Sequence, residues 1–73
     1  MSEQLSRAVA GEIRRLLDER GMSGRELSRR SGLPQQTIAR KLAGDRAFDL
    51  DELPPICDAL GIDLADLLAW ARS

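Results

Sequence analysis

Apolar residues recur at intervals of three or four along most of the chain, and glycines interrupt this pattern. In residues 3–20 the apolar positions are Leu5, Val9, Ile13, Leu16 and Leu17. Such spacing is typical of a helix that turns one face toward a core. No stretch alternates apolar and polar residues in the two-residue rhythm of a strand. The pattern therefore predicts an all-α fold.

Glycines and helix-capping residues divide the chain into a compact bundle of five expected helices. Their ranges are 3–20, 23–31, 34–43, 49–60 and 64–71. Ser23 with Glu26, and Asp49 with Glu52, have the spacing of a capping box, in which two side chains satisfy backbone N–H groups at a helix start. The other expected N-caps are Ser2 and Asp63.

The fourth helix carries two adjacent prolines near its start. Pro54 and Pro55 lack N–H donors and crowd the preceding turn, so they predict a distorted first turn. The apolar positions expected on the inward face are Leu50, Leu53, Ile56, Cys57 and Leu60. Cys57 is expected to be a small core residue, and a redox switch or an intersubunit disulfide is the alternative.

Composition excludes several classes of protein. The 73 residues include one Cys and no His, so Cys57 has no disulfide partner within the chain and a structural zinc site lacks ligands. Without His, imidazole-based catalysis is excluded. The acidic residues do not follow calcium-loop spacing, and they are expected as caps and solvated side chains. We expect one domain over residues 1–73, with no enzymatic activity, no cofactor and no metal.

Apolar runs in this chain are too short for a membrane span. The longest is Leu67-Leu68-Ala69-Trp70-Ala71, so neither a membrane-spanning segment nor a signal-peptide core is expected. We therefore expect a cytoplasmic protein with no membrane partner.

The net charge of −1 hides a division between the two parts of the chain. Residues 1–48 hold ten basic and six acidic residues, whereas residues 49–73 hold one Arg and six acids. Within residues 20–46 the balance is seven basic to two acidic. Such asymmetry indicates a face that binds a polyanion. A solvated surface of mixed sign is the alternative, and it is the more common one.

The segment 23–43 has the residue types of two short helices joined by a tight turn. Gly32 stands at the turn, where a positive φ is expected. Leu27 and Ile38 are the apolar positions that would set the angle between the helices. The remaining face of the later helix is polar, with Gln, Thr and Arg side chains that can address base edges. The segment therefore predicts a helix-turn-helix.

Helix starts, turn glycines and apolar positions follow one another in a characteristic order from Ile13 to Leu68. The stretches that carry it are Arg20-Gly21-Met22-Ser23, Glu26-Leu27-Ser28, Gly32-Leu33-Pro34-Gln35-Gln36-Thr37-Ile38, Gly44, and Leu53-x-x-Ile56-Cys57-x-Ala59-Leu60-Gly61-Ile62. In these stretches the chain resembles the lambda-repressor-like helix-turn-helix family of phage repressors, Cro proteins and small bacterial regulators. The resemblance implies a helix-turn-helix at 23–43 and C-terminal helices over 49–72 that complete the core.

Some positions depart from that family pattern. Leu17 and Leu42 stand where many members carry a buried Arg–Glu pair, and apolar replacement of such a pair is often neutral or stabilising. Ser28 stands where members usually have Ala, Lys41 where they have an apolar residue, and Pro34 where many have a Ser or Thr cap.

The resemblance implies that helix 34–43 enters the major groove of a two-fold symmetric operator. Residues expected to contact bases are Gln35, Gln36 and Arg40. Residues expected to contact phosphates are Ser23, Gly24, Arg25, Thr37, Lys41 and Arg46. For the base-contact residues the alternative is a solvated helix face or a contact to phosphate alone. Thr37 could instead contact a thymine methyl or be ordinary surface, and the sequence leaves open whether Arg29 and Arg30 face the DNA.

A C-terminal pairing surface is also implied by the resemblance. The residues expected at a homodimer interface are Leu64, Leu67, Leu68 and Trp70. Trp70 is the only aromatic residue in 49–73, and it fits a core position and an interface equally well.

Two functions are weighed on these grounds. The first is a sequence-specific transcriptional regulator of the repressor or Cro type that binds double-stranded DNA as a homodimer. The alternative is a protein-interaction module, such as an antitoxin or the partner of a regulator, that uses the acidic C-terminal half.

Overall fold

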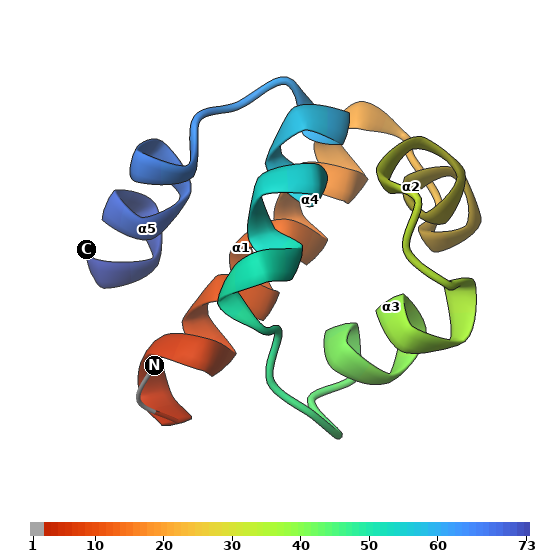
Figure 1. The fold of residues 1–73 in the computed structure, drawn as a ribbon. Helices are drawn as coiled ribbons and strands as arrows, with labels where there is room; N and C mark the ends of the chain where they lie inside the picture. Colours follow the sequence, from red (N-terminus) through yellow and green to blue (C-terminus); the bar gives the residue numbers. More distant parts are fainter. Residues whose placement is uncertain (1–2) are drawn as a thin grey trace.

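The computed structural model describes residues 3–73, and all regular structure in that range is helical (Figure 1). The elements are α1 (Glu3–Arg20), α2 (Gly24–Ser31), α3 (Gln35–Leu42), the 3₁₀ turn η1 (Leu50–Glu52), α4 (Leu53–Leu60) and α5 (Leu64–Arg72). The all-α prediction is confirmed, with helix boundaries close to the predicted ones. The predicted cap Ser2 lies outside the described residues.

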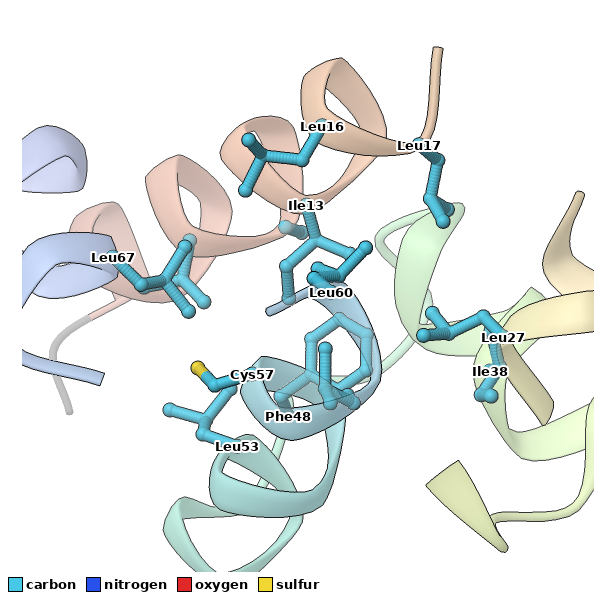
Figure 2. Close-up of a cluster of buried hydrophobic side chains, with 13 residues drawn as sticks. Ile13, Leu16, Leu17, Leu27, Ile38, Phe48, Leu53, Cys57, Leu60 and Leu67 are labelled. Carbon is cyan, nitrogen blue, oxygen red and sulfur yellow. The ribbon is translucent and has the colours of Figure 1, made fainter. Parts of the chain in front are cut away.

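The first helix runs through the middle of the molecule. α5 and α3 both pack against α1, and α2 packs against α3 and α4. In Figure 1, α4 crosses in front of α1, with α5 on one side and the α2–α3 pair on the other. The core shown in Figure 2 consists of Val9, Ala10, Ile13, Leu16, Leu17, Leu27, Ile38, Phe48, Leu53, Ile56, Cys57, Leu60 and Leu67. These side chains come from every helix, so the core orients each helix relative to the others.

The start of the fourth helix is distorted, as the two prolines predict. A 3₁₀ turn, η1, precedes α4, and the prolines occupy the first turn of α4, where backbone N–H groups have no acceptor within the helix. Asp49 and Glu52 form the predicted capping box, and the Glu52 carboxylate accepts a hydrogen bond from the Asp49 amide at 2.8 Å. Asp63 occupies the N-cap of α5, but its side chain makes no capping hydrogen bond.

One apolar prediction in this region is wrong. The helical spacing predicts Leu50 on the inward face of the fourth helix, but it is 59% exposed. Phe48 enters the core from the preceding loop instead and is 3% exposed (Figure 2). Because Phe48 fills core space at this end of α4, Leu50 is left on the surface.

The first helix also sends two arginines to the ends of other helices. The Arg14 guanidinium donates to the carbonyl oxygen of Leu42, the last residue of α3. The Arg20 Nε donates to the carbonyl oxygen of Leu60, the last residue of α4, at 3.1 Å. A cation at a helix C-terminus satisfies an unpaired carbonyl and complements the helix dipole. α1 is thereby joined to α3 by a charge-assisted hydrogen bond as well as by apolar packing.

Candidate nucleic-acid interface

The turn between α2 and α3 has the geometry that the sequence predicts. Gly32 has φ +80° and ψ 2°, and its N–H donates to the Ser28 carbonyl at 2.9 Å. The Ser28 hydroxyl donates to the Leu33 carbonyl at 2.5 Å. Leu27 and Ile38 are fully buried on either side of the turn. The unusual Ser28 therefore has a local role, because its hydroxyl satisfies a carbonyl of the turn.

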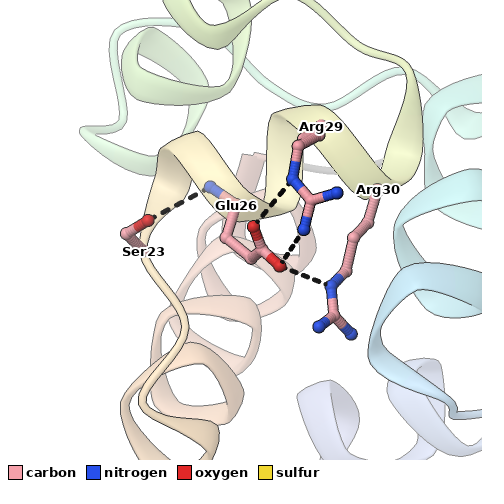
Figure 3. A network of polar contacts seen from close by, with 4 residues as sticks. All are labelled: Ser23, Glu26, Arg29 and Arg30. Carbon is pink, nitrogen blue, oxygen red and sulfur yellow. Dashed lines mark hydrogen bonds and ion pairs between the residues drawn. The ribbon is translucent and has the colours of Figure 1, made fainter.

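The start of α2 differs from the prediction in one hydrogen bond. The Ser23 hydroxyl accepts from the Glu26 amide at 3.1 Å, as expected of an N-cap (Figure 3). The Glu26 carboxylate, however, pairs with Arg29 and Arg30 instead of returning to the Ser23 amide. Two guanidinium groups offer charge-assisted hydrogen bonds that a single amide does not match. Hydrogen bonds from Arg29 and then Arg30 hold the pKa of Glu26 below its ordinary value.

The Glu26 carboxylate partly neutralises the positive charge of two arginines of α2. Arg29 lies 2.5 Å and Arg30 lies 2.8 Å from the same Glu26 oxygen. The three side chains together carry one net positive charge, although the sequence shows two adjacent arginines. Arg29 and Arg30 therefore add less positive charge to the surface of α2 than their number suggests. Arg25, in the first turn of the helix, takes part in no ion pair among residues 3–73.

The polar face of α3 brings together the residues predicted to contact bases. Gln35, Gln36 and Arg40 are all exposed, and Thr37 is half-buried at the edge of this face. Residues four apart lie one above the other on a helix, so Gln36 and Arg40 are neighbours. Ile38 anchors the opposite side of α3 in the core with no exposed surface.

Lys41 lies elsewhere than the phosphate prediction requires. Its residue exposure is 8%, and its ammonium pairs with the Glu52 carboxylate. A second carboxylate oxygen, Oδ2 of Asp49, lies 3.6 Å from the ammonium. The Lys41 side chain follows the inward side of α3, so it is directed toward the start of α4 and not toward the face that carries Gln36.

The other residues predicted at phosphates are accessible. Ser23 and Arg25 are exposed at the start of α2, and Arg46 is exposed in the loop after α3. Within residues 3–73 the amides of Gly24 and Arg25 have no hydrogen-bond partner, as is usual in a first helical turn. A side chain at Gly24 would lie 4.0 Å from Ile38, so the start of α2 is next to α3.

The residues predicted at a dimer interface divide into two groups. Leu67 is fully buried in the core, so it has no surface left for a partner. Leu64 and Leu68 are half-buried against the core, and Trp70 is 39% exposed. The Trp70 ring lies beneath the Arg15 guanidinium, 5.9 Å from centroid to Cζ, and therefore covers α1 while its remaining surface faces outward.

Ala39, four residues after Gln35, is also exposed on the polar face of α3. Sequence reasoning missed two contacts of this region. Glu52 as the partner of Lys41, and Arg14 as the donor to α3, are contacts between elements and have no local signal. Cys57 is 2% exposed, and burial, followed by Asp58 and Asp63, raises the pKa of its thiol.

Comparisons with known proteins agree with this geometry. A family model described as a Cro/C1-type helix-turn-helix DNA-binding domain matches residues 12–72. The solved structure of the clp gene regulator ClgR from C. glutamicum is 26% identical, with a TM-score of 0.83, and the match covers 93% of this chain and 88% of ClgR. The wild-type restriction-modification controller protein C.Esp1396I is 22% identical, with a TM-score of 0.84 over 99% of this chain and 92% of that one.

No curated protein matches the chain. No helix within residues 3–73 is both long and apolar enough to cross a membrane.

Proposed function

The chain belongs to the Cro/C1-type helix-turn-helix family and is a DNA-binding transcriptional regulator, and we propose that it reads a specific operator by placing α3 in the major groove. The observation that carries the proposal is the exposed polar face of α3. Gln35, Gln36 and Arg40 lie on that face, while Ile38 holds the helix to the core. Glutamine pairs in a bidentate manner with adenine, and arginine with guanine.

Contacts to the DNA backbone would flank this reading face. The Gly24 and Arg25 amides at the start of α2 can hydrogen-bond a phosphate, and the helix dipole favours an anion there. Arg25 and Arg46 supply positive charge on either side of α3, with Ser23 and Thr37 as uncharged donors. Lys41 is left out of this set because its ammonium is paired with Glu52.

A homodimer would double this surface. Leu64, Leu68 and Trp70 are the residues of α5 that retain accessible surface and that we propose at the interface. Two copies of α3 would then read half-sites about one helical turn apart on a symmetric operator.

Selection of bound duplexes from a random pool tests the proposal. The expected result is a symmetric consensus bound far more tightly than random DNA.

Gln36→Ala is expected to weaken binding to the operator by about tenfold and binding to random DNA much less, because one bidentate base contact is lost. Gln4→Ala, an exposed glutamine of α1, is the matched control and should change neither affinity.

A salt series measures the backbone contacts. If Arg25 and Arg46 are the cations that reach phosphates, log Kd should rise with log salt with a slope of about 1.8 per protomer. Arg25→Ala should reduce that slope by about 0.9 and weaken both kinds of DNA alike. No binding to any duplex at low salt, or an affinity independent of salt, would contradict DNA binding.

The second candidate function is recruitment of another protein through the acidic half. The exposed apolar residues Leu50 and Trp70 both lie in that half, beside several carboxylates. Co-purification of a basic partner that protects Trp70 from solvent would favour it. This function is compatible with DNA binding through α3, because the two surfaces are different.

A further inference from the structure

We propose that Lys41 is a positioning residue for base recognition, which holds the C-terminal end of α3 against the start of α4 through Glu52. The proposal rests on the proposed function, because it concerns how α3 is aimed at base edges. It assigns to Lys41 a role other than the phosphate contact that the sequence predicts.

The Lys41–Glu52 pair is largely shielded from water. The Lys41 side chain is 10% exposed and that of Glu52 is 16% exposed. The same Glu52 oxygen, Oε1, pairs with the ammonium and accepts the Asp49 amide at 2.8 Å. Glu52 therefore joins the capping box of η1 to α3, across the loop that carries Arg46. Within residues 3–73 no buried side-chain nitrogen or oxygen lacks a partner.

The short α3 needs a second point of attachment to have a fixed direction. Its N-cap, Pro34, makes no side-chain capping hydrogen bond, so the turn with Gln35 and Gln36 is not held by a cap. Ile38 holds the middle of the helix in the core. A contact at one point leaves a helix free to pivot, and a second contact one turn away removes that freedom. In the last turn of α3, Leu42 packs against the core, and the Lys41–Glu52 pair and the Arg14 bond to the last carbonyl of α3 add polar contacts at the same end.

Base reading depends on this direction much more than phosphate binding does. A bidentate contact between glutamine and adenine requires both atoms in place, so productive geometry tolerates shifts of only about 0.5 Å. Contacts between an arginine and a phosphate tolerate more, since the side chain is long and flexible and much of the attraction is a long-range Coulomb interaction. Loss of the pair should therefore lower the preference for the operator over random DNA.

Three variants separate positioning from phosphate contact. Lys41→Met keeps the length of the side chain without its charge. Glu52→Gln keeps an oxygen acceptor for the Asp49 amide but loses the ion pair, and it changes a residue that cannot itself attract a phosphate. Lys41→Arg keeps a cation that can pair with Glu52. Affinities for the selected operator and for a random duplex are measured over a salt series, with thermal unfolding of each variant as a check on folding.

Positioning predicts that Lys41→Met and Glu52→Gln each lower the operator preference by about tenfold, the scale of one lost base contact, with an unchanged salt slope. The double variant should be no worse than either single one, because both remove the same pair. Lys41→Arg should retain the wild-type preference for the operator. A phosphate contact instead predicts that Lys41→Met reduces the slope by about 0.9 per protomer, weakens both duplexes alike, and leaves Glu52→Gln without effect. That result would overturn the proposal.

The remaining outcomes are also decisive. If Lys41→Met does not fold, Glu52→Gln decides the question, since its retained acceptor preserves the cap of η1. A wild-type protein that binds the operator while Glu52→Gln retains its full preference would overturn the positioning role alone. A wild-type protein that binds no DNA would overturn the proposed function itself.

Discussion

Individual side-chain pairings decide which basic residues are available to DNA. Of the seven basic residues in 20–46, four have protein partners: Arg20 at the Leu60 carbonyl, Arg29 and Arg30 at Glu26, and Lys41 at Glu52. The other three, which form no ion pair within residues 3–73, are Arg25, Arg40 and Arg46. The positive surface is therefore narrower than the charge count suggests, and it is centred on α3 and its two flanks.

Glu26 makes the stability of α2 dependent on pH. Its folded-state pKa lies below the ordinary value of 4.5 because of Arg29 and then Arg30. A depressed carboxyl pKa adds stability that is complete above the unfolded-state value and is lost as the pH falls through the folded-state value. The stability of the wild type relative to Glu26→Gln should therefore be constant above about pH 5 and should shrink below about pH 4.

Thermal unfolding of both proteins across this range measures the difference. The effect should be small, because the network is exposed to solvent. Glu3→Gln removes a carboxylate that pairs with the exposed Arg7 and serves as the matched control. A difference between wild type and Glu26→Gln that grows as the pH falls would contradict the assignment.

Among the helices, the turn before α3 is determined by local residues, whereas the start of α4 depends also on packing against other elements. The turn at Gly32 needs a positive φ, which a local signal predicts. At the start of α4 the prolines predict a distorted turn, but not that Phe48 replaces Leu50 in the core. The length and ends of each helix are local properties, whereas the faces that become buried depend on the neighbouring elements.

Two glycine substitutions are expected to change stability in opposite directions. Gly32→Ala should destabilise the protein by about 1–2 kcal/mol, because φ is +80° there and a Cβ disfavours that region. Gly11→Ala should stabilise it by up to about 1 kcal/mol, because Gly11 lies inside α1 and an added Cβ would meet only the Arg14 side chain, at 3.7 Å.

Denaturant unfolding of both variants checks this pair of predictions. Stabilisation by Gly32→Ala would contradict the turn geometry. Destabilisation by Gly11→Ala would indicate a closer contact at α1 than the structure shows.

At the scale of the whole molecule, the charge division separates two surfaces. The polar face of α3 lies on the basic part of the chain, whereas α5, with Leu64, Leu68 and Trp70, lies on the acidic part. A surface that repels DNA is suited to contact a protein instead. This arrangement supports pairing through α5 while α3 remains available to the operator.

The single tryptophan reports directly on such pairing. Because Trp70 is 39% exposed in the protomer, its fluorescence emission should shift to shorter wavelength as protein concentration rises and a dimer forms. The shift should coincide with a doubling of mass in sedimentation equilibrium. Trp70→Ala should weaken the dimer, and Leu50→Ala, an exposed residue in η1, should not. An 8.0-kDa species with unchanged emission at concentrations that saturate the operator would contradict pairing.

The sequence by itself determined the all-helical class, the approximate ends of the helices and the polar face of the helix that carries Gln35 and Gln36. These properties depend on residues within one or two turns of each other, because apolar spacing, caps and turn glycines act locally. The N-cap role of Ser23 and the turn at Gly32 belong to this group.

Only the tertiary structure decided how the cations and the remaining apolar residues are used. Lys41 meets Glu52 across 11 residues of sequence, and Arg14 meets Leu42 across 28. Such contacts depend on which helices lie side by side, and that depends on how the whole core fills. For the same reason Leu67 and Phe48 are buried while Leu50 is exposed. The helical spacing of apolar residues along the chain does not distinguish these three positions.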